Sequence, residues 1–128
     1  MVGLVIVSHS KKIADGIRDL LINKVGNCEL IEAVGGAIDG TLGTNVVAIR
    51  KAIEKVAQPD GVIVFADLGS SVMSASMAIE FMDMKLQEKI KIANAPILEG
   101  ALAVAKFLKN ADLDEIMAVI KKSRETAV

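Results

Sequence analysis

The chain has 128 residues, of which 52% are hydrophobic and 24% are charged. A single domain over residues 1–128 is expected, because this length can bury a core and this composition excludes disorder. Fifteen basic and sixteen acidic residues give a net charge of -1, which offers no bulk attraction to nucleic acid or to an anionic membrane. No apolar stretch approaches the length of a membrane span, so we expect no membrane insertion.

The single cysteine, Cys28, has no partner for an internal disulfide. The first residues lack the basic and then apolar pattern of a signal peptide, so a cytoplasmic location is expected. Tryptophan and tyrosine are absent, whereas methionine occurs six times. The core must therefore be built from aliphatic and thioether groups.

The first part of the chain predicts a strand, a helix, a second strand and a loop. An apolar run predicts a strand at 3–7, and Ser10 is a suitable N-cap for a helix that reaches about residue 24. The residues expected on the buried face of this helix are Ile13, Ile17, Leu20 and Leu21. A second strand is expected at 28–34, with Cys28 buried in it. The segment 35–44 is too rich in glycine for regular structure.

The same alternation continues to the end of the chain. From Val46 on, apolar residues recur at helical spacing and predict a second helix that ends before Pro59. A fully apolar strand follows at 62–65. After the segment 66–71, a third helix carries Met73, Met77 and Phe81 at spacings of four. The later elements are expected at 90–93 (strand), 97–109 (helix) and 112–122 (helix). The residues expected on the inner face of the last helix are Leu113, Ile116 and Ile120.

This alternation predicts an α/β fold with a doubly wound, mainly parallel sheet flanked by about five helices. Right-handed crossovers make 2-1-3-4 the expected strand order, with the first and third strands adjacent at the centre. The turns that follow these two strands therefore meet at one edge of the sheet. One turn carries His9, the only histidine, and the other carries Asp67 ahead of a helix start at Gly69.

The pairing of His9 with Asp67 suits nucleophilic chemistry. A carboxylate that accepts the Nδ1 proton fixes the tautomer in which the Nε2 lone pair is free for attack. A phosphoryl group on Nε2 is then expected to meet hydroxyl groups and the backbone N–H groups of a helix start. The candidate phosphate-binding residues are Ser8, Ser10, Gly69, Ser70 and Ser71.

Several other residues are expected near this edge of the sheet or on the third helix. The candidate rim residues from the glycine-rich loop are Gly36, Ala37, Asp39, Thr41 and Thr44. Lys11 and Lys12 either stabilise phosphate or are only solvated, and Glu99 favours a helix start. The residues interpreted as core and flank of the third helix are Met73, Met77, Phe81, Met82 and Met84. A methionine-rich face also suits a dimer or a transient partner.

Other reactive motifs are missing from the sequence. It contains no Gly-x-x-x-x-Gly-Lys-Ser/Thr phosphate loop, no Gly-x-Gly-x-x-Gly turn and no second histidine or cysteine for a zinc site. No serine lies in a Gly-x-Ser-x-Gly elbow. We therefore expect no metal site, no bound cofactor and no nucleotide site in this chain, and a group carrier rather than a hydrolase.

Four segments together resemble the mannose-type IIA domains of the bacterial phosphoenolpyruvate-dependent sugar phosphotransferase system. The resemblance covers essentially the whole chain and extends to the phosphotransferase subunits of dihydroxyacetone kinase complexes. The segments are LVIVSHS at 4–10, the loop with GAIDG and LGT at 36–44, DLGS at 67–70 and APILEG at 95–100. Each segment is weak alone, but the four together are specific.

The resemblance implies that His9 is the phosphorylated residue and that Asp67 is its hydrogen-bond partner. It implies a homodimer and a phosphotransferase that relays a phosphoryl group from phosphoenolpyruvate through a general phosphocarrier protein to His9. The group then passes to ADP on a separate nucleotide-binding subunit and supports phosphorylation of dihydroxyacetone. The chain ends at Val128 without fused carrier domains, so separate general carriers are expected.

Three alternatives remain open at this point. The first is the IIA component of a mannose-type sugar transporter, which passes its phosphoryl group to a different acceptor. A receiver-type signalling domain also places an aspartate near the end of its third strand, but it needs an acidic pair for Mg²⁺ where this sequence has Ser8, His9 and Ser10. In a non-catalytic binding module, His9 has no chemical role.

Overall fold

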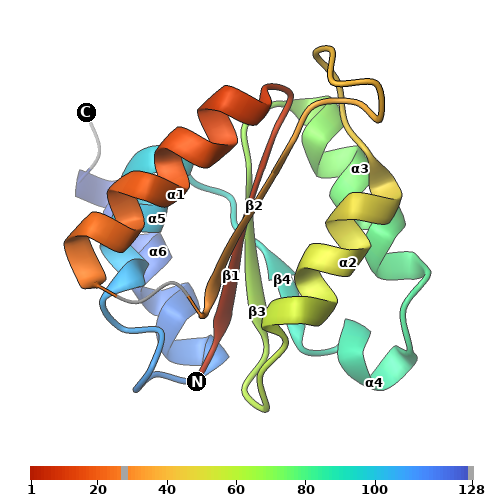
Figure 1. The fold of residues 1–128 in the computed structure, drawn as a ribbon. Coiled ribbons are helices and arrows are strands. Elements are labelled where there is room, and N and C mark those ends of the chain that lie inside the picture. The colour runs from red at the N-terminus through yellow and green to blue at the C-terminus, as the bar shows by residue number, and fades with distance from the viewer. Residues whose placement is uncertain (27–28, 127–128) are drawn as a thin grey trace.

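Four parallel strands form one sheet in the part of the chain that the computed structural model describes, residues 1–26 and 29–126. The strands are β1 (Gly3–Ser8), β2 (Ile31–Gly35), β3 (Val62–Ala66) and β4 (Ile90–Ile92). Their order is β2-β1-β3-β4, so the predicted α/β class and strand order are confirmed (Figure 1). All six residues of β1 are buried, because β1 has a strand on each side and helices over both faces.

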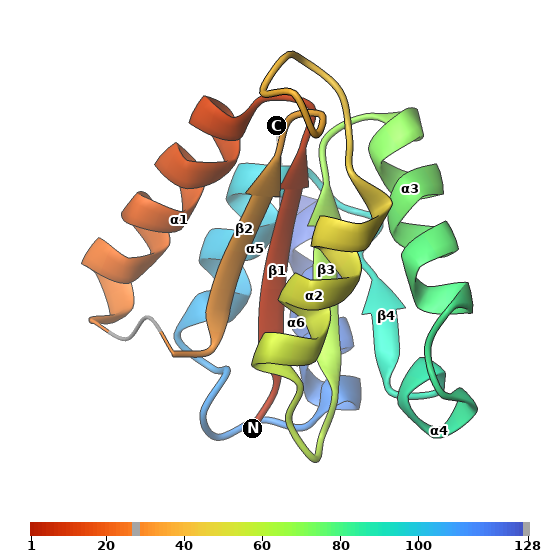
Figure 2. The ribbon, with the colours of Figure 1, turned by 45° about the vertical axis from the view of Figure 1, so that its right-hand side comes forward.

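Helices cover both faces of the sheet, and the described residues form six helices where about five were predicted. They are α1 (Lys11–Val25), α2 (Val46–Val56), α3 (Gly69–Glu80), α4 (Met84–Gln87), α5 (Ile97–Ala105) and α6 (Leu113–Thr126). Helices α1, α5 and α6 pack with Leu4 and Ile6 on one face, whereas α2 and α3 pack with Val5 and Val7 on the other (Figures 1 and 2). The unpredicted helix is α4, a single turn that is too short to show a period in the sequence.

Local signals in the sequence set the ends of the first two helices. The Ser10 hydroxyl accepts a hydrogen bond from the Ile13 N–H at 3.3 Å, as expected of an N-cap. Gly26 ends α1 with a φ of 71°, a left-handed conformation that glycine adopts without strain. The Asn45 side chain caps α2 through the Ala48 N–H at 3.1 Å. The N-cap side chains therefore satisfy a backbone N–H group in the first turn of each helix.

Two glycines allow neighbouring layers to approach closely. A Cβ atom on Gly35, at the end of β2, would lie 2.5 Å from the Ser10 carbonyl oxygen and 2.6 Å from Lys11 Cα. A Cβ atom on Gly100 in α5 would lie 2.8 Å from the Phe65 ring. Glycine at position 35 thus lets α1 begin directly against β2, immediately after His9.

Several predicted boundaries and faces were wrong in detail. Strand β2 begins at Ile31 rather than at residue 28, and the predicted burial of Cys28 falls outside the described residues. Strand β4 ends at Ile92, and α5 ends at Ala105 instead of Lys109. On α1, Ile17 and Leu21 are buried, but Ile13 and Leu20 are exposed, because the core covers a narrower stripe than the apolar pattern suggested.

The interpretation of the third helix as carrying a methionine core is also wrong for most of its residues. The exposed fractions are 68% for Met73, 48% for Met77, 69% for Phe81 and 73% for Met84, and only Met82 is buried. The residues of α3 that face the interior are Ser71, Ala75 and Ala78. These small side chains let α3 pack closely on the sheet and against α2, and they leave the large apolar side chains outside.

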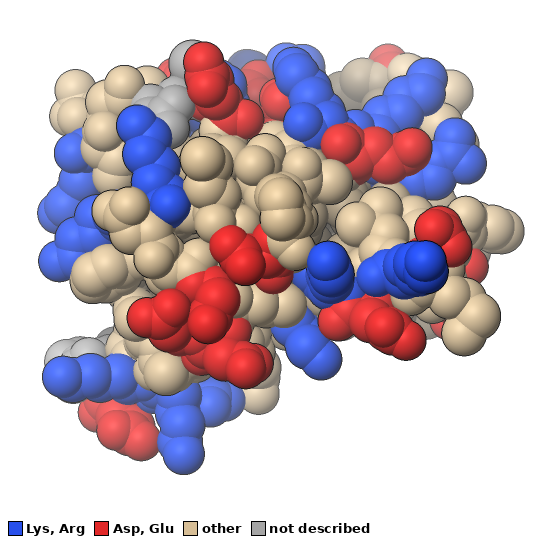
Figure 3. All heavy atoms as spheres, turned by 90° about the horizontal axis from the view of Figure 1, so that it is seen from below, with Lys and Arg blue, Asp and Glu red and all other residues tan. Residues whose placement is uncertain are grey.

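Neither basic nor acidic side chains dominate the end of the molecule where the strands begin. Figure 3 shows that basic and acidic residues are interspersed there around an uncharged centre. No helix within residues 1–26 and 29–126 is both long and apolar enough to cross a membrane.

Candidate active site

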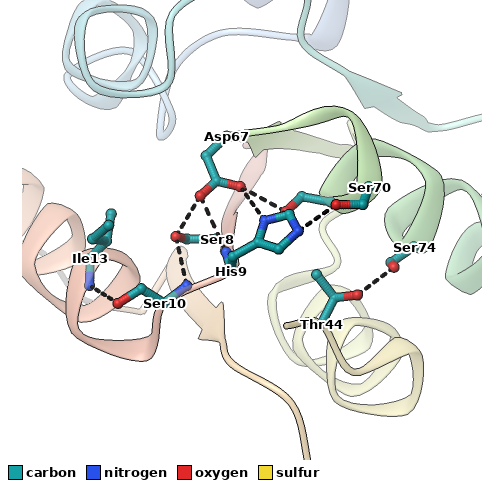
Figure 4. A network of polar contacts seen from close by, with 9 residues as sticks. Ser8, His9, Ser10, Ile13, Thr44, Asp67, Ser70 and Ser74 are labelled. Carbon is teal, nitrogen blue, oxygen red and sulfur yellow. Dashed lines mark hydrogen bonds and ion pairs between the residues drawn. The ribbon is translucent and has the colours of Figure 1, made fainter. Parts of the chain in front are cut away.

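His9 and Asp67 follow two neighbouring strands, β1 and β3, and lie together at the edge where these strands end (Figure 4). The register pairs Val7 with Ala66, which brings the next residues of both strands to the same level. The His9 ring atom Nδ1 lies 3.3 Å from Asp67 Oδ1, and the His9 backbone N–H donates to Asp67 Oδ2 at 3.2 Å. The His9 and Asp67 side chains are 23% and 17% exposed, so both are mostly shielded but remain within reach of solvent.

Two buried serines hold the Asp67 carboxylate. The Ser8 hydroxyl donates to Oδ2 at 2.7 Å, and the Ser71 hydroxyl donates to Oδ1 at 2.7 Å. Burial raises the pKa of Asp67, but the hydrogen bonds from Ser71, Ser8 and His9 outweigh it and lower the pKa to about 2. Asp67 is therefore an anion at neutral pH and can only accept hydrogen bonds.

The two ring nitrogens of His9 have different surroundings. Nδ1 faces Asp67 Oδ1 and the Ser71 hydroxyl oxygen, the latter at 2.9 Å, and Nε2 contacts the hydroxyl of Ser70 (Figure 4). Because the Asp67 carboxylate carries no proton, the favourable neutral tautomer has its proton on Nδ1. The lone pair of Nε2 then accepts the Ser70 hydroxyl proton on the exposed side of the ring.

The hydroxyl groups predicted to bind phosphate do not all lie at Nε2. Ser8 Oγ is fully buried, donates to Asp67 and accepts the Ser10 N–H at 3.1 Å. The Ser10 hydroxyl caps α1, and the Ser71 hydroxyl lies at Nδ1. Ser70 has the one hydroxyl among the four that contacts Nε2. Helix α3 begins beside it at Gly69, and its N-cap residue Leu68 provides no side-chain hydrogen bond to the first turn.

The glycine-rich loop between β2 and α2 is fastened to the backbone of His9. The Gly43 N–H donates to the His9 carbonyl at 2.9 Å, and the Gly36 N–H contacts the Ser8 carbonyl at 3.4 Å. The next residue, Thr44, shares a hydrogen bond of 2.6 Å with Ser74 of α3, which ties the end of the loop to that helix (Figure 4). Ser74 was not among the predicted site residues, and Gly43 was noted only as part of the LGT segment, since both act here by holding the loop in place.

The tip of the loop holds its own shape and presents apolar side chains to solvent. The Thr41 backbone N–H and hydroxyl both donate to Asp39 Oδ1, and these bonds lower the pKa of the Asp39 carboxyl. The Ala37 N–H donates to the Thr41 carbonyl at 2.8 Å. Ile38 is 91% exposed and Leu42 is 78% exposed. The predicted rim is thus a loop held by its own hydrogen bonds, and it carries two exposed apolar side chains that were not among the predicted rim residues.

The basic residues after His9 lie beside the site without entering it. Lys11 Nζ pairs with Asp15 of the same helix at 2.7 Å, and Lys12 is exposed. Both line an open hollow of about 410 Å³ between the start of α1 and the loop residues Thr41 and Leu42. No group of three potential metal ligands is present in the described ranges, 1–26 and 29–126.

A family model described as the PTS system fructose IIA component, EIIA-man, matches residues 3–121. The chain belongs to this family. The resemblance to mannose-type IIA domains is therefore confirmed. The match spans the strand that precedes His9, the glycine-rich loop, the turn with Asp67 and the segment that begins α5.

The family's named relatives include phosphoryl donor subunits of dihydroxyacetone kinases. The chain is 39% identical over 105 residues to "PEP-dependent dihydroxyacetone kinase 2, phosphoryl donor subunit DhaM" of Listeria innocua, which covers 82% of this chain and 84% of that protein. It is 35% identical to the DhaM subunit of Escherichia coli over 91% of this chain, but it spans only 26% of that protein.

Two solved structures share the fold. A protein described as of unknown function, EF1359, has a TM-score of 0.79 and 35% identity, with 94% of this chain and 92% of that chain covered. The phosphotransferase system component EIIA from Streptococcus agalactiae has a TM-score of 0.72 at 20% identity, with 100% and 95% covered. The second likeness supports the fold alone.

Proposed function

We propose that this chain is a cytoplasmic, single-domain phosphocarrier whose His9 accepts a phosphoryl group on Nε2. The donor is a general phosphocarrier protein charged from phosphoenolpyruvate. The acceptor is ADP on a nucleotide-binding subunit that supports phosphorylation of dihydroxyacetone. The observation that carries the proposal is the division of the His9 ring, with Nδ1 held by Ser71 and Asp67 and Nε2 on the open side.

The reaction needs no proton transfer at His9. The Nε2 lone pair attacks phosphorus, and the bond to the donor atom breaks with its electron pair left on the donor. The ring keeps the Nδ1 proton and gains positive charge, which the Asp67 carboxylate stabilises through Oδ1. In the second step, a terminal oxygen of ADP attacks phosphorus, and the electron pair of the N–P bond returns to Nε2.

The start of α3 is the proposed place for the phosphoryl oxygens. The Ser70 hydroxyl contacts Nε2, and the backbone N–H groups of Gly69, Ser70 and Ser71 lie in the first turn of a helix without a side-chain cap. Such a turn favours negative charge by about 0.3–1 kcal/mol near the surface. Ser8 and Ser10 take part by holding Asp67 and the start of α1 instead.

The exposed apolar side of α3 supports a homodimer. Between Gly69 and Ile79 this helix contains no charged residue. Its large side chains at Met73 and Met77 continue through Phe81 to Met84, all of them exposed. An uncharged apolar stripe of this length is costly to leave in water. In a two-fold symmetric dimer, the stripe of one copy packs against the same stripe of the second copy.

The printed names of the relatives favour the dihydroxyacetone pathway over a mannose-type sugar transporter. A receiver-type domain is disfavoured because the end of β1 presents a serine and a histidine where Mg²⁺ would need carboxylates. A non-catalytic module does not account for a partly buried carboxylate and two buried serines arranged around a single histidine.

Phosphorylation of the purified chain by phosphoenolpyruvate and the general carriers tests the proposal. We expect a mass gain of one phosphoryl group, stable in alkali and labile in acid, and no gain in His9→Ala. ADP together with the nucleotide-binding subunit should discharge the adduct, and ADP alone should not. Equal labelling of His9→Ala, or phosphorylation of dihydroxyacetone from ATP by this chain alone, would contradict the proposal.

A further inference from the structure

The Ser71 hydroxyl lies between the histidine and the carboxylate. Its oxygen is 2.9 Å from His9 Nδ1 and 2.7 Å from Asp67 Oδ1, whereas the direct distance from Nδ1 to Oδ1 is 3.3 Å. Typical N–H···O hydrogen bonds measure about 2.9–3.0 Å, so the direct contact is the weakest of the three. The histidine and the carboxylate are thus better connected through Ser71 than to each other.

The direction of the two hydrogen bonds of Ser71 follows from the proton count. A serine hydroxyl has one proton to donate and two lone pairs that accept. The ionised carboxylate of Asp67 can only accept, so the Ser71 proton goes to Asp67 Oδ1. The Ser71 oxygen is then left to accept, and the Nδ1–H of His9 is the donor within reach.

We propose that Ser71 is a positioning residue, whose hydroxyl accepts the Nδ1 proton of His9 and so keeps Nε2 unprotonated. Asp67 acts mainly through this hydroxyl, by fixing the direction in which it donates. The kinetic consequence of the proposal rests on the proposed function. The tautomer itself is a property of the unphosphorylated chain and can be measured without any partner.

The hydroxyl of Ser71 has little freedom to make other bonds. Ser71 is fully buried and lies on the inner face of α3 together with Ala75 and Ala78. An exposed serine exchanges its partners with water, but a buried one must use the polar groups around it. The preceding residue, Ser70, is exposed and contacts Nε2. Two successive residues of one helix therefore hold opposite sides of the same ring.

This arrangement supplies a matched pair of variants, Ser71→Ala and Ser70→Ala. Loss of the Ser71 hydroxyl leaves Nδ1–H with only the long contact to Asp67, so the tautomer protonated on Nε2 should become populated. Loss of the Ser70 hydroxyl removes a contact at Nε2, so the Nδ1–H tautomer should persist. Ser71→Cys keeps a weak donor and acceptor at the same place and should lie between Ser71→Ala and the native chain.

The tautomer can be read from the ¹⁵N resonances of the imidazole. The chain has a single histidine, so the signals belong to His9, and the couplings of each nitrogen to the ring protons tell Nδ1 from Nε2. At alkaline pH we expect one protonated and one unprotonated ring nitrogen in the native chain and in Ser70→Ala. In Ser71→Ala the two resonances should move toward each other. Single-turnover phosphorylation should fall roughly 10-fold in Ser71→Ala, the scale of one lost hydrogen bond to a charged network. Urea unfolding of each variant shows whether the fold is kept.

Two results would overturn the proposal. The first is a folded Ser71→Ala variant whose imidazole signals match the native ones. The second is a slower phosphorylation with an unchanged tautomer, which would assign Ser71 to the phosphoryl group instead. A changed tautomer in a chain whose His9 takes up no phosphoryl group would support the positioning role and refute the carrier function, so the two failures are distinguishable.

Discussion

Replacement of Asp67 by asparagine removes the charge at the centre of the site while it keeps the shape of the side chain. The pKa of Asp67 is about 2, against 3.8 for an unperturbed aspartate. One pKa unit corresponds to about 1.36 kcal/mol, so the folded site stabilises the ionised form by about 2 kcal/mol. Because the Asp67 side chain is partly open to solvent, with 17% of it exposed, screening makes this figure an upper bound.

The pH dependence of this stabilisation has a definite sign. The pKa is lower in the folded chain than in the unfolded chain, so the contribution is fully present above pH 3.8 and is lost as the pH falls toward 2. In urea unfolding at pH 7, we expect Asp67→Asn to be less stable than the native chain by about 1–2 kcal/mol. The difference should narrow as the pH falls below about 4, because the other carboxyl groups are common to both chains.

The same substitution should slow phosphorylation of His9. The amide cannot stabilise the positive charge that develops on the ring, and its NH₂ group is a donor where the Ser71 hydroxyl and the His9 N–H groups need an acceptor. We expect the single-turnover rate to fall by roughly 10², the scale for loss of one preorganised electrostatic contact. Asp19→Asn, on the exposed side of α1, is the matched control and should change neither quantity. An unchanged rate with a stability difference that does not depend on pH would refute this reasoning.

Two further predictions concern packing and assembly. Gly35→Ala should lower the free energy of unfolding by roughly 1–3 kcal/mol, because its Cβ would meet backbone atoms of Ser10 and Lys11. Gly16→Ala has open space around its Cβ and should raise the free energy of unfolding by about 0.5–1 kcal/mol. A urea titration compares them, and equal effects would show that α1 does not need its close approach to β2. Sedimentation should give about twice the 13.5 kDa monomer mass at micromolar concentration, and Phe81→Glu with Met77→Glu should give the monomer. Leu20→Glu, on the other face of the sheet, should leave the dimer intact, and a native chain that sediments as a monomer would argue against the interface.

The topology was predictable because its signals are strong and local. The apolar runs at 3–7 and 62–65 are long enough only for strands, and right-handed crossovers leave few strand orders. His9 and Asp67 each lie two residues beyond the end of one of these runs, which placed both at one edge of the sheet before any distance was known. The chemistry was less determined, since the residues alone left open a receiver domain or a binding module, and the family resemblance narrowed the choice.

The separate tasks of the serines were not predictable, because they depend on the exact level at which α3 begins relative to the end of β1. Ser70 and Ser71 are adjacent in sequence, and a rotation of about 100° between successive helical residues sends one to Nε2 and the other to Nδ1. The prediction of which face of α3 is buried was wrong for a related reason. A spacing of four marks one side of a helix without showing which side is buried, and here the small residues Ala75 and Ala78 pack inward.

The contrast between the two sides of the His9 ring suits a residue that must release what it binds. The Nδ1 side is built from the buried hydroxyls of Ser71 and Ser8 and the partly buried Asp67 carboxylate, which would stabilise the ring with or without a phosphoryl group. The Nε2 side offers an exposed hydroxyl and a helix start, and the nearby Lys11 is paired with Asp15. A fixed cation on the phosphoryl group would stabilise the charged carrier and slow its discharge. In the proposed carrier, the site contacts mainly the ring and binds the phosphoryl group weakly. The phosphoryl group is then not trapped on His9, and its transfer from the donor and to the acceptor stays close to reversible.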